Sequence, residues 1–187
     1  MTSHLEQKNQ HHSRTTMDAE RPLRVLIIYY SRTGTTKKLA KVLAEMLNAD
    51  LAEIRCDRYR PGIFRYLRAG YDSVRIKLPP IRFPPMAPHD YDLVLIGGPV
   101  WTSYPALPLR SFLAHPPGLP PRIGLFLTYG GHSDPVVAFE AMAASLSQPV
   151  AERLAVKAQH VADGSYVTAA RAFAEVLSKV YRDGFKV

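Results

Sequence analysis

Cysteine is almost absent from the sequence, with Cys56 the single example. One thiol excludes an internal disulfide framework and a zinc site built from cysteines. Long hydrophobic runs are also missing, since none approaches the roughly 20 residues that a membrane-spanning helix needs. The first twenty residues lack the apolar stretch that a secretory signal requires. These absences predict a cytoplasmic protein with no transmembrane segment.

The length of 187 residues fits one globular domain, because domains commonly contain roughly 100–200 residues. Residues 1–22 are polar and show no apolar periodicity, so we expect a disordered tail followed by a folded domain over 23–187. The histidines are scattered, and none forms a metal-binding pair at helical spacing, so we expect no metal site.

Acidic residues are too few to balance the basic ones, and the net charge is +8. Much of the excess lies in residues 57–85, where basic side chains alternate with apolar residues at helical spacing. The basic residues there are Arg58, Arg60, Arg65, Arg68, Arg75, Lys77 and Arg82. The pattern predicts a basic helical segment, which is either a solvated helix face or a site for an anionic partner such as NADPH phosphates, an acidic protein or anionic lipid. No nucleic-acid-binding motif accompanies the charge, so we expect no nucleic-acid partner.

Apolar runs of strand length alternate with helical patterns along the rest of the chain. Strands are predicted at 25–30, 51–55, 93–96 and 123–127, with an alternating edge strand around 154–158. We expect Pro105 in the first turn of the third helix, Asp134 as N-cap of a helix ending near Ser147, and a last helix after Gly164. Five strand–helix alternations indicate an α/β protein with a doubly wound, five-stranded parallel sheet in three α/β/α layers.

Ligands of such sheets bind beyond the carboxyl ends of the strands, which directs attention to three loops. The first loop contains Ser31, Arg32, Thr33, Gly34, Thr35 and Thr36. Hydroxyl groups around a glycine at a helix start favour a phosphate cradle, because helix N-termini attract anions. An ordinary helix start capped by Ser31 or Thr33 is the alternative.

The second and third loops are rich in aromatic residues and glycine. The second holds Pro99, Val100, Trp101, Thr102, Ser103 and Tyr104, and the third holds Thr128, Tyr129, Gly130, Gly131 and His132. Trp101 either stacks on a flat ligand ring or packs against the rim of the sheet. The third loop is either a wall of the site or a plain surface turn. Together the three loops indicate a nucleotide with a large planar ring.

These loops carry a resemblance to a known family. Residues 29–36, Tyr-Tyr-Ser-Arg-Thr-Gly-Thr-Thr, resemble the flavodoxin phosphate loop, [ST]-x-T-G-x-T. Gly-Gly-Pro-Val-Trp at 97–101, with Pro-Leu-Arg-Ser-Phe-Leu at 108–113, is similar to the second loop of that family and its following helix, and residues 128–133 match the third loop in place. The resemblance implies a short-chain flavodoxin-like fold, strand order 2-1-3-4-5, and bound FMN. It implies that 31–36 hold the phosphate, that 99–104 hold one face of the ring, and that 128–133 line the other.

Flavodoxins are typically acidic, whereas the pI of this sequence is about 9.7. The resemblance implies an oxidoreductase that passes electrons from NAD(P)H to a quinone or similar acceptor, with the flavin and no side chain carrying the chemistry. The alternative is an electron carrier that serves a redox partner protein. A third hypothesis is a hydrolase using Ser133, since residues 131–135 nearly match a nucleophile elbow, but Pro135 replaces its last glycine. The oligomeric state stays open.

Overall fold

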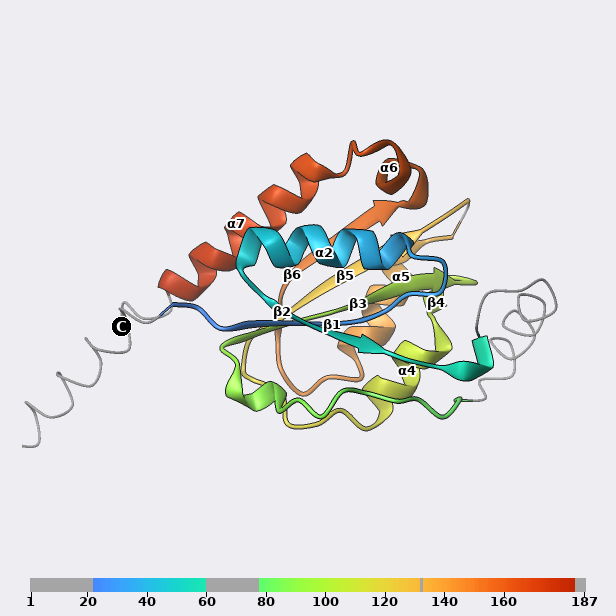
Figure 1. Ribbon diagram of the computed structural model, residues 1–187, viewed down its shortest axis with the longest axis horizontal. Helices are drawn as coiled ribbons and strands as arrows, with labels where there is room; N and C mark the ends of the chain where they lie inside the picture. Colours follow the sequence, from blue (N-terminus) through green and yellow to red (C-terminus); the bar gives the residue numbers. More distant parts are fainter. Residues whose placement is uncertain (1–21, 60–77, 132, 184–187) are drawn as a thin grey trace, which may run out of the picture.

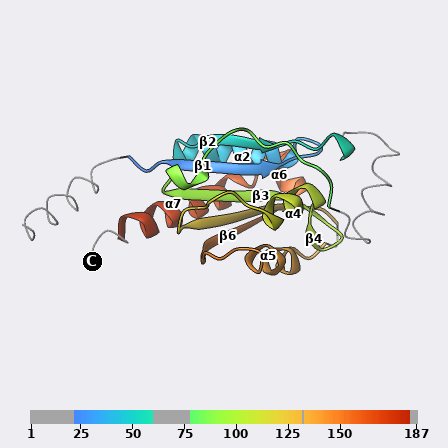
Figure 2. The same ribbon diagram turned by 90° about the horizontal axis from the view of Figure 1, so that it is seen from below.

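The computed structural model describes residues 22–59, 78–131 and 133–183, and its central feature is a parallel sheet. The five parallel strands are β1 (Val25–Tyr30), β2 (Asp50–Ile54), β3 (Leu93–Trp101), β5 (Ile123–Tyr129) and β6 (Val150–Lys157). They lie in the order β2-β1-β3-β5-β6, which confirms the predicted 2-1-3-4-5 topology. Figure 2, the view from below, shows β2 and β6 at opposite sides of the sheet with β1 and β3 between them.

Helices cover both faces of this sheet. The helices are α2 (Thr35–Leu47), α4 (Leu107–Ala114), α5 (Pro135–Ala143), α6 (Ala158–Asp163) and α7 (Val167–Asp183). One apolar cluster joins the sheet to α2, α6 and α7, and a second joins it to α4 and α5. Figure 1 shows α2 and α7 on one side and α4 on the other. The predicted three-layer architecture is therefore confirmed.

Strand β1 shows why the sequence builds two cores. All its residues are buried, and neighbouring side chains point to opposite faces. Leu26 and Ile28 enter the core under α4 and α5, whereas Val25 and Ile27 enter the core under α2 and α7. A continuous apolar run is thus the pattern expected of a strand covered on both sides.

Proline placement at the third helix differs from the prediction. Pro105 is not in the first turn of a helix, because it belongs to the two-residue strand β4 (Tyr104–Pro105) and pairs with Val100 in an antiparallel hairpin. The amide of Ala106 donates a 2.9 Å hydrogen bond to the carbonyl of Pro99 and closes this hairpin. Pro108 occupies the first turn of α4 instead.

Two other boundaries also differ. Helix α5 begins as predicted, with the amide of Val136 donating to the Asp134 carboxylate at 2.8 Å, but it ends at Ala143, before Ser147. Ala158 begins the short helix α6, which the alternating pattern around it concealed. Gly164, in the left-handed conformation at φ 86°, ends α6.

The tail prediction for 1–22 falls almost wholly outside the described residues, as does most of the basic segment over 57–85. At its start, Asp57–Tyr59 form a short 3₁₀ helix (η1), and a second 3₁₀ helix (η2) follows the segment at Pro88–Asp90. Within the described ranges, no helix is long and apolar enough to cross a membrane.

Candidate cofactor cleft

The three predicted loops meet in one cleft of about 620 Å³ beyond the carboxyl ends of β1, β3 and β5. The adjacency of these strands accounts for the meeting, since their carboxyl ends lie at the same edge of the sheet. The lining residues that sequence reasoning named are Arg32, Thr33, Thr35, Thr36, Pro99, Val100, Trp101, Thr102, Thr128, Tyr129, Gly130 and Gly131. Ser133 and Ala158 also line the cleft. Ser31, Gly34, Ser103 and Tyr104 were predicted too, but they are not among its lining residues, and His132 lies outside the described residues.

Gly34 determines the shape of the first loop. It is the N-cap of α2 at φ 95°, in place of the predicted Ser31 or Thr33. The Ser31 hydroxyl oxygen nevertheless accepts 3.2 Å hydrogen bonds from the amides of Gly34 and Lys37, and so it organises the loop. A Cβ on Gly34 would meet no heavy atom within 4 Å, so the space beside this backbone is open. Only glycine adopts this conformation without strain.

The first turn of α2 supplies donors for an anion. Its early amides have no partners within the helix, and the first turn contains no acidic residue to compete for them. The Thr33 and Thr35 hydroxyls lie 3.4 Å apart at the cleft. Thr36 is different, because its buried hydroxyl pairs with that of Thr128 at 2.7 Å and joins the first loop to the third.

Trp101 combines the two arrangements predicted for it. Its ring contacts Tyr30 edge-to-face, with centroids 5.9 Å apart, and contacts Tyr59 in the same way at 5.4 Å. These contacts seat it on the rim of the sheet. It is only half-buried and lines the cleft as well. The two tyrosines therefore fix the orientation of an indole that a flat ligand can reach.

The turn after Trp101 has unusual backbone geometry. Thr102 and Ser103 have φ of 46° and 66°, and they connect β3 to β4. Two-residue hairpins favour this left-handed pair, although asparagine and glycine are the usual residues. Tyr104 lies beyond the turn, 45% exposed, with the Arg110 guanidinium 5.6 Å from its ring centroid.

The third loop turns at Gly131, whose φ is 59°. The amide of Ser133 donates to the carbonyl of Gly130 at 3.3 Å, and the neighbouring Asp134 carboxylate caps α5. Ser133 thus belongs to the cleft wall. Sequence reasoning did not assign Ala158 to the site, because a small apolar residue at the start of α6 carries no chemical signal.

Other chemistry finds little support in the described residues. They hold no group of three or more histidine, cysteine or acidic side chains that can bind a metal ion. Burial raises the pKa of the Cys56 thiol, so it stays protonated near neutral pH.

No protein-family model and no curated protein matches the sequence. Solved structures do match. A flavoprotein from Lactobacillus acidophilus NCFM, in complex with FMN, has a TM-score of 0.60 and 24% identity over 79% of this chain and 97% of that chain. The NMR structure of the apo-form of the flavoprotein from Lactobacillus acidophilus NCFM has a TM-score of 0.57 and 27% identity over 72% and 93%. A short-chain flavodoxin associated with a bacterial microcompartment has a TM-score of 0.50 and 13% identity over 85% and 99%. This chain therefore has the flavodoxin-like fold.

Proposed function

We propose that this protein binds FMN in the cleft and acts as an oxidoreductase, passing electrons from NAD(P)H to a quinone or similar acceptor. The observation that carries the proposal is the meeting of an open helix N-terminus and an oriented tryptophan in one cleft. The similarity to an FMN-bound flavoprotein supports it.

The phosphate end of FMN fits the loop before α2. The open side of Gly34 admits a phosphate close to the backbone, where the first amides of α2 donate hydrogen bonds. The Thr33 and Thr35 hydroxyls add donors, and Arg32 contributes positive charge at the cleft. All these groups complement a dianion.

The ring of FMN fits the second and third loops. The cleft volume of about 620 Å³ lies within the range of roughly 300–1,000 Å³ found for small-molecule sites. Trp101 and Pro99 offer apolar surface on one side, and Tyr129 offers an aromatic ring from the third loop. Bound FMN supplies the redox chemistry, so the chain itself binds, orients and partly shields the ring.

An anaerobic titration tests the electron donor. FMN-loaded protein is titrated with NADPH or NADH while its visible flavin absorbance is followed. The proposal expects rapid bleaching. A flavin band that persists until dithionite is added contradicts the reductase and identifies an electron carrier for a redox partner protein. Failure to bind FMN contradicts the whole proposal.

A glycine variant tests the phosphate loop. We expect Gly34→Ala to weaken FMN binding by about tenfold, because alanine opposes the left-handed conformation that the loop must adopt to bind. Gly118→Ala is the matched control, since its Cβ would have ordinary contacts, the nearest at 3.7 Å to His89. Equal FMN affinity in both variants would place the phosphate elsewhere.

A further inference from the structure

A second, smaller pocket of about 290 Å³ lies beyond the ends of β1 and β2. Arg32 lines both this pocket and the cofactor cleft, so the two cavities share a wall. Ser31 and Tyr30 also line it, from the end of β1 and the loop that follows. The pocket therefore adjoins the loop to which the cofactor phosphate is assigned.

Three arginines from separate segments line this pocket: Arg32, Arg55 and Arg82. Arg55 and Arg82 form an isolated antiparallel bridge, with two 2.8 Å backbone hydrogen bonds between them. Directly paired residues of antiparallel strands place their side chains on the same face, where like charges repel. An anion between the two guanidinium groups removes that repulsion.

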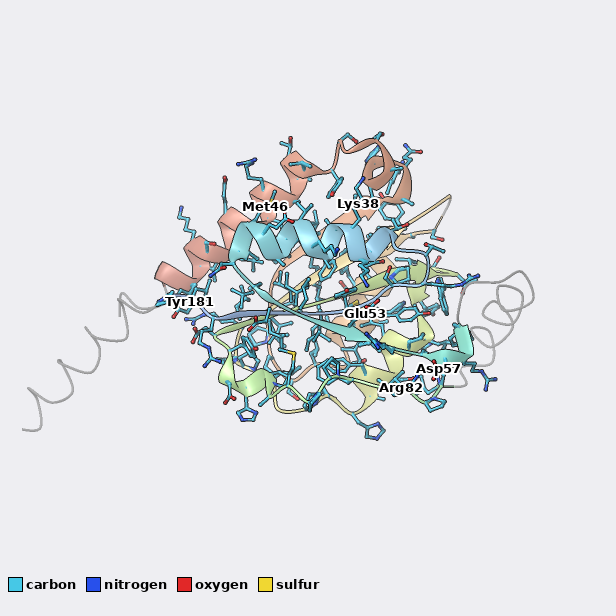
Figure 3. All side chains as sticks on the ribbon, in the orientation of Figure 1. Lys38, Met46, Glu53, Asp57, Arg82 and Tyr181 are labelled. Carbon is cyan, nitrogen blue, oxygen red and sulfur yellow. The ribbon has the colours of Figure 1, made fainter. Side chains whose placement is uncertain are left out.

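The carboxylates of the pocket are already engaged. Glu53 forms a 3.0 Å ion pair with Lys37, and Asp57 forms an ion pair with Arg82. Figure 3 shows Asp57 and Arg82 beside each other near the end of β2, with Glu53 on the strand. A guanidinium has five N–H donors, so Arg82 keeps donors for a second acceptor. The exposed Arg55 adds a further positive charge.

Two of the residues that line the pocket, Tyr30 and Ser31, carry hydroxyl groups with unused donor capacity. The Tyr30 hydroxyl is buried and makes no hydrogen bond with any part of the protein that the structure describes. Burial raises its pKa far above the ordinary value, so it stays protonated and able to donate. The Ser31 oxygen accepts two amide hydrogen bonds, which leaves its hydrogen available.

We infer that this pocket is a second phosphate-binding site, separate from the loop that holds the phosphate of FMN. Arginine forks and hydroxyl donors recognise phosphate oxygens through charge-assisted hydrogen bonds. Two sources supply such a group next to a flavin. One is the diphosphate of FAD bound in place of FMN, and the other is a phosphate of the nucleotide reductant. The choice between these sources rests on the proposed function.

Binding measurements with one variant and its control test the site. Arg55→Gln removes one guanidinium, and Arg171→Gln makes the same charge change at an exposed position on α7. The probes are FMN and FAD, followed by flavin fluorescence, and adenosine 2′,5′-bisphosphate, followed by calorimetry on FMN-loaded protein. We expect Arg55→Gln to lower the affinity for FAD or for the bisphosphate by about tenfold. We expect FMN affinity, and every affinity of Arg171→Gln, to stay within about twofold of wild type.

Each result has a definite meaning. Weaker FAD binding alone assigns the pocket to a flavin diphosphate, and weaker bisphosphate binding alone assigns it to the reductant. Unchanged affinity for both probes overturns the site, as does their failure to bind the wild type. A tenfold loss of FMN affinity in Arg55→Gln would show that the pocket is not separate from the FMN phosphate site. If FMN does not bind at all, the proposed function fails. Bisphosphate binding to the FMN-free protein then still tests whether the pocket binds phosphate, by comparison of Arg55→Gln with Arg171→Gln.

A second variant separates binding from folding. Tyr30→Phe removes a hydroxyl that has no hydrogen-bond partner in the described structure. We expect it to leave the melting temperature equal or higher and to lower the affinity for the same probe severalfold. A lower melting temperature with unchanged probe affinity would show that the hydroxyl serves the fold and would remove it from the site.

Discussion

Two glycines within β3, Gly97 and Gly98, let the strand pack closely against its neighbours. A Cβ on Gly97 would lie 2.4 Å from ring carbons of Phe126, its partner on β5. A Cβ on Gly98 would lie 2.8 Å from a methyl carbon of Leu109 on α4. These close contacts bring β3 against its neighbours just where it leads into the cleft. Because these two residues have no side chain, β3 packs closely against Phe126 and Leu109 before the chain enters the second loop.

We expect Gly97→Ala to lower the free energy of unfolding by about 1–3 kcal/mol, because the new methyl group must displace the Phe126 ring from a packed core. Urea denaturation of the FMN-free protein measures the change. Gly130→Ala is the control, since its Cβ would meet nothing within 4 Å, and we expect a change within about 0.5 kcal/mol. Equal stability of the two variants would mean that the ring moves aside at no cost.

At the scale of the elements, one buried contact connects α2 to β5. The hydroxyls of Thr36 and Thr128 are 2.7 Å apart, and the two residues are only 1% and 2% exposed. Each hydroxyl therefore satisfies the other where water is excluded. The contact holds the phosphate loop and the third loop at a fixed separation.

A double-mutant cycle tests this contact. We expect Thr36→Val and Thr128→Val each to cost about 1–3 kcal/mol of stability, since each leaves the other hydroxyl buried without a partner. The double variant should lose less than the sum of the two, because no unsatisfied group remains. The free energies of unfolding in urea give the coupling, and strict additivity would show that the two hydroxyls act independently.

The sequence predicted the elements whose pattern is local. Strand β1 is an apolar run, and Asp134 before Pro135 is a helix start, and both were predicted correctly. Strand β4 was missed because it is made by the hairpin contact between Val100 and Pro105. The loop residues around the cleft were predicted because parallel topology brings strand ends together. The Arg55–Arg82 bridge was not predicted, because it depends on a contact between distant segments.

At the scale of the whole molecule, the net charge is positive, and buried tyrosines have pKa values above the ordinary one. Burial, with the nearby Glu53 carboxylate, raises the pKa of Tyr29 to about 12. Burial also raises the pKa values of Tyr30 and Cys56. These groups all stay neutral in the folded state at a pH where the unfolded chain ionises. These three groups therefore make the fold less stable in base.

We expect stability to fall as the pH rises from about 10 to 12. The unfolded Tyr29 loses its proton near its ordinary pKa of about 10, whereas the folded one keeps it to about 12, so its contribution is complete below pH 10 and disappears across this interval. Urea midpoints measured between pH 8 and about 12 test the trend. Tyr29→Phe should show a shallower decline, and a decline equal to that of the wild type would assign the effect to other groups.

The Arg55–Arg82 pair also affects how molecules of this protein meet one another. Among the described residues, β2 is the outermost strand of the sheet, and such a strand offers its backbone to a strand of a neighbouring molecule. Arg82 occupies both backbone hydrogen-bonding groups of Arg55 and adds a second guanidinium there. Because this bridge leaves no backbone group of Arg55 unpaired, it opposes edge-to-edge pairing with a second copy at this position.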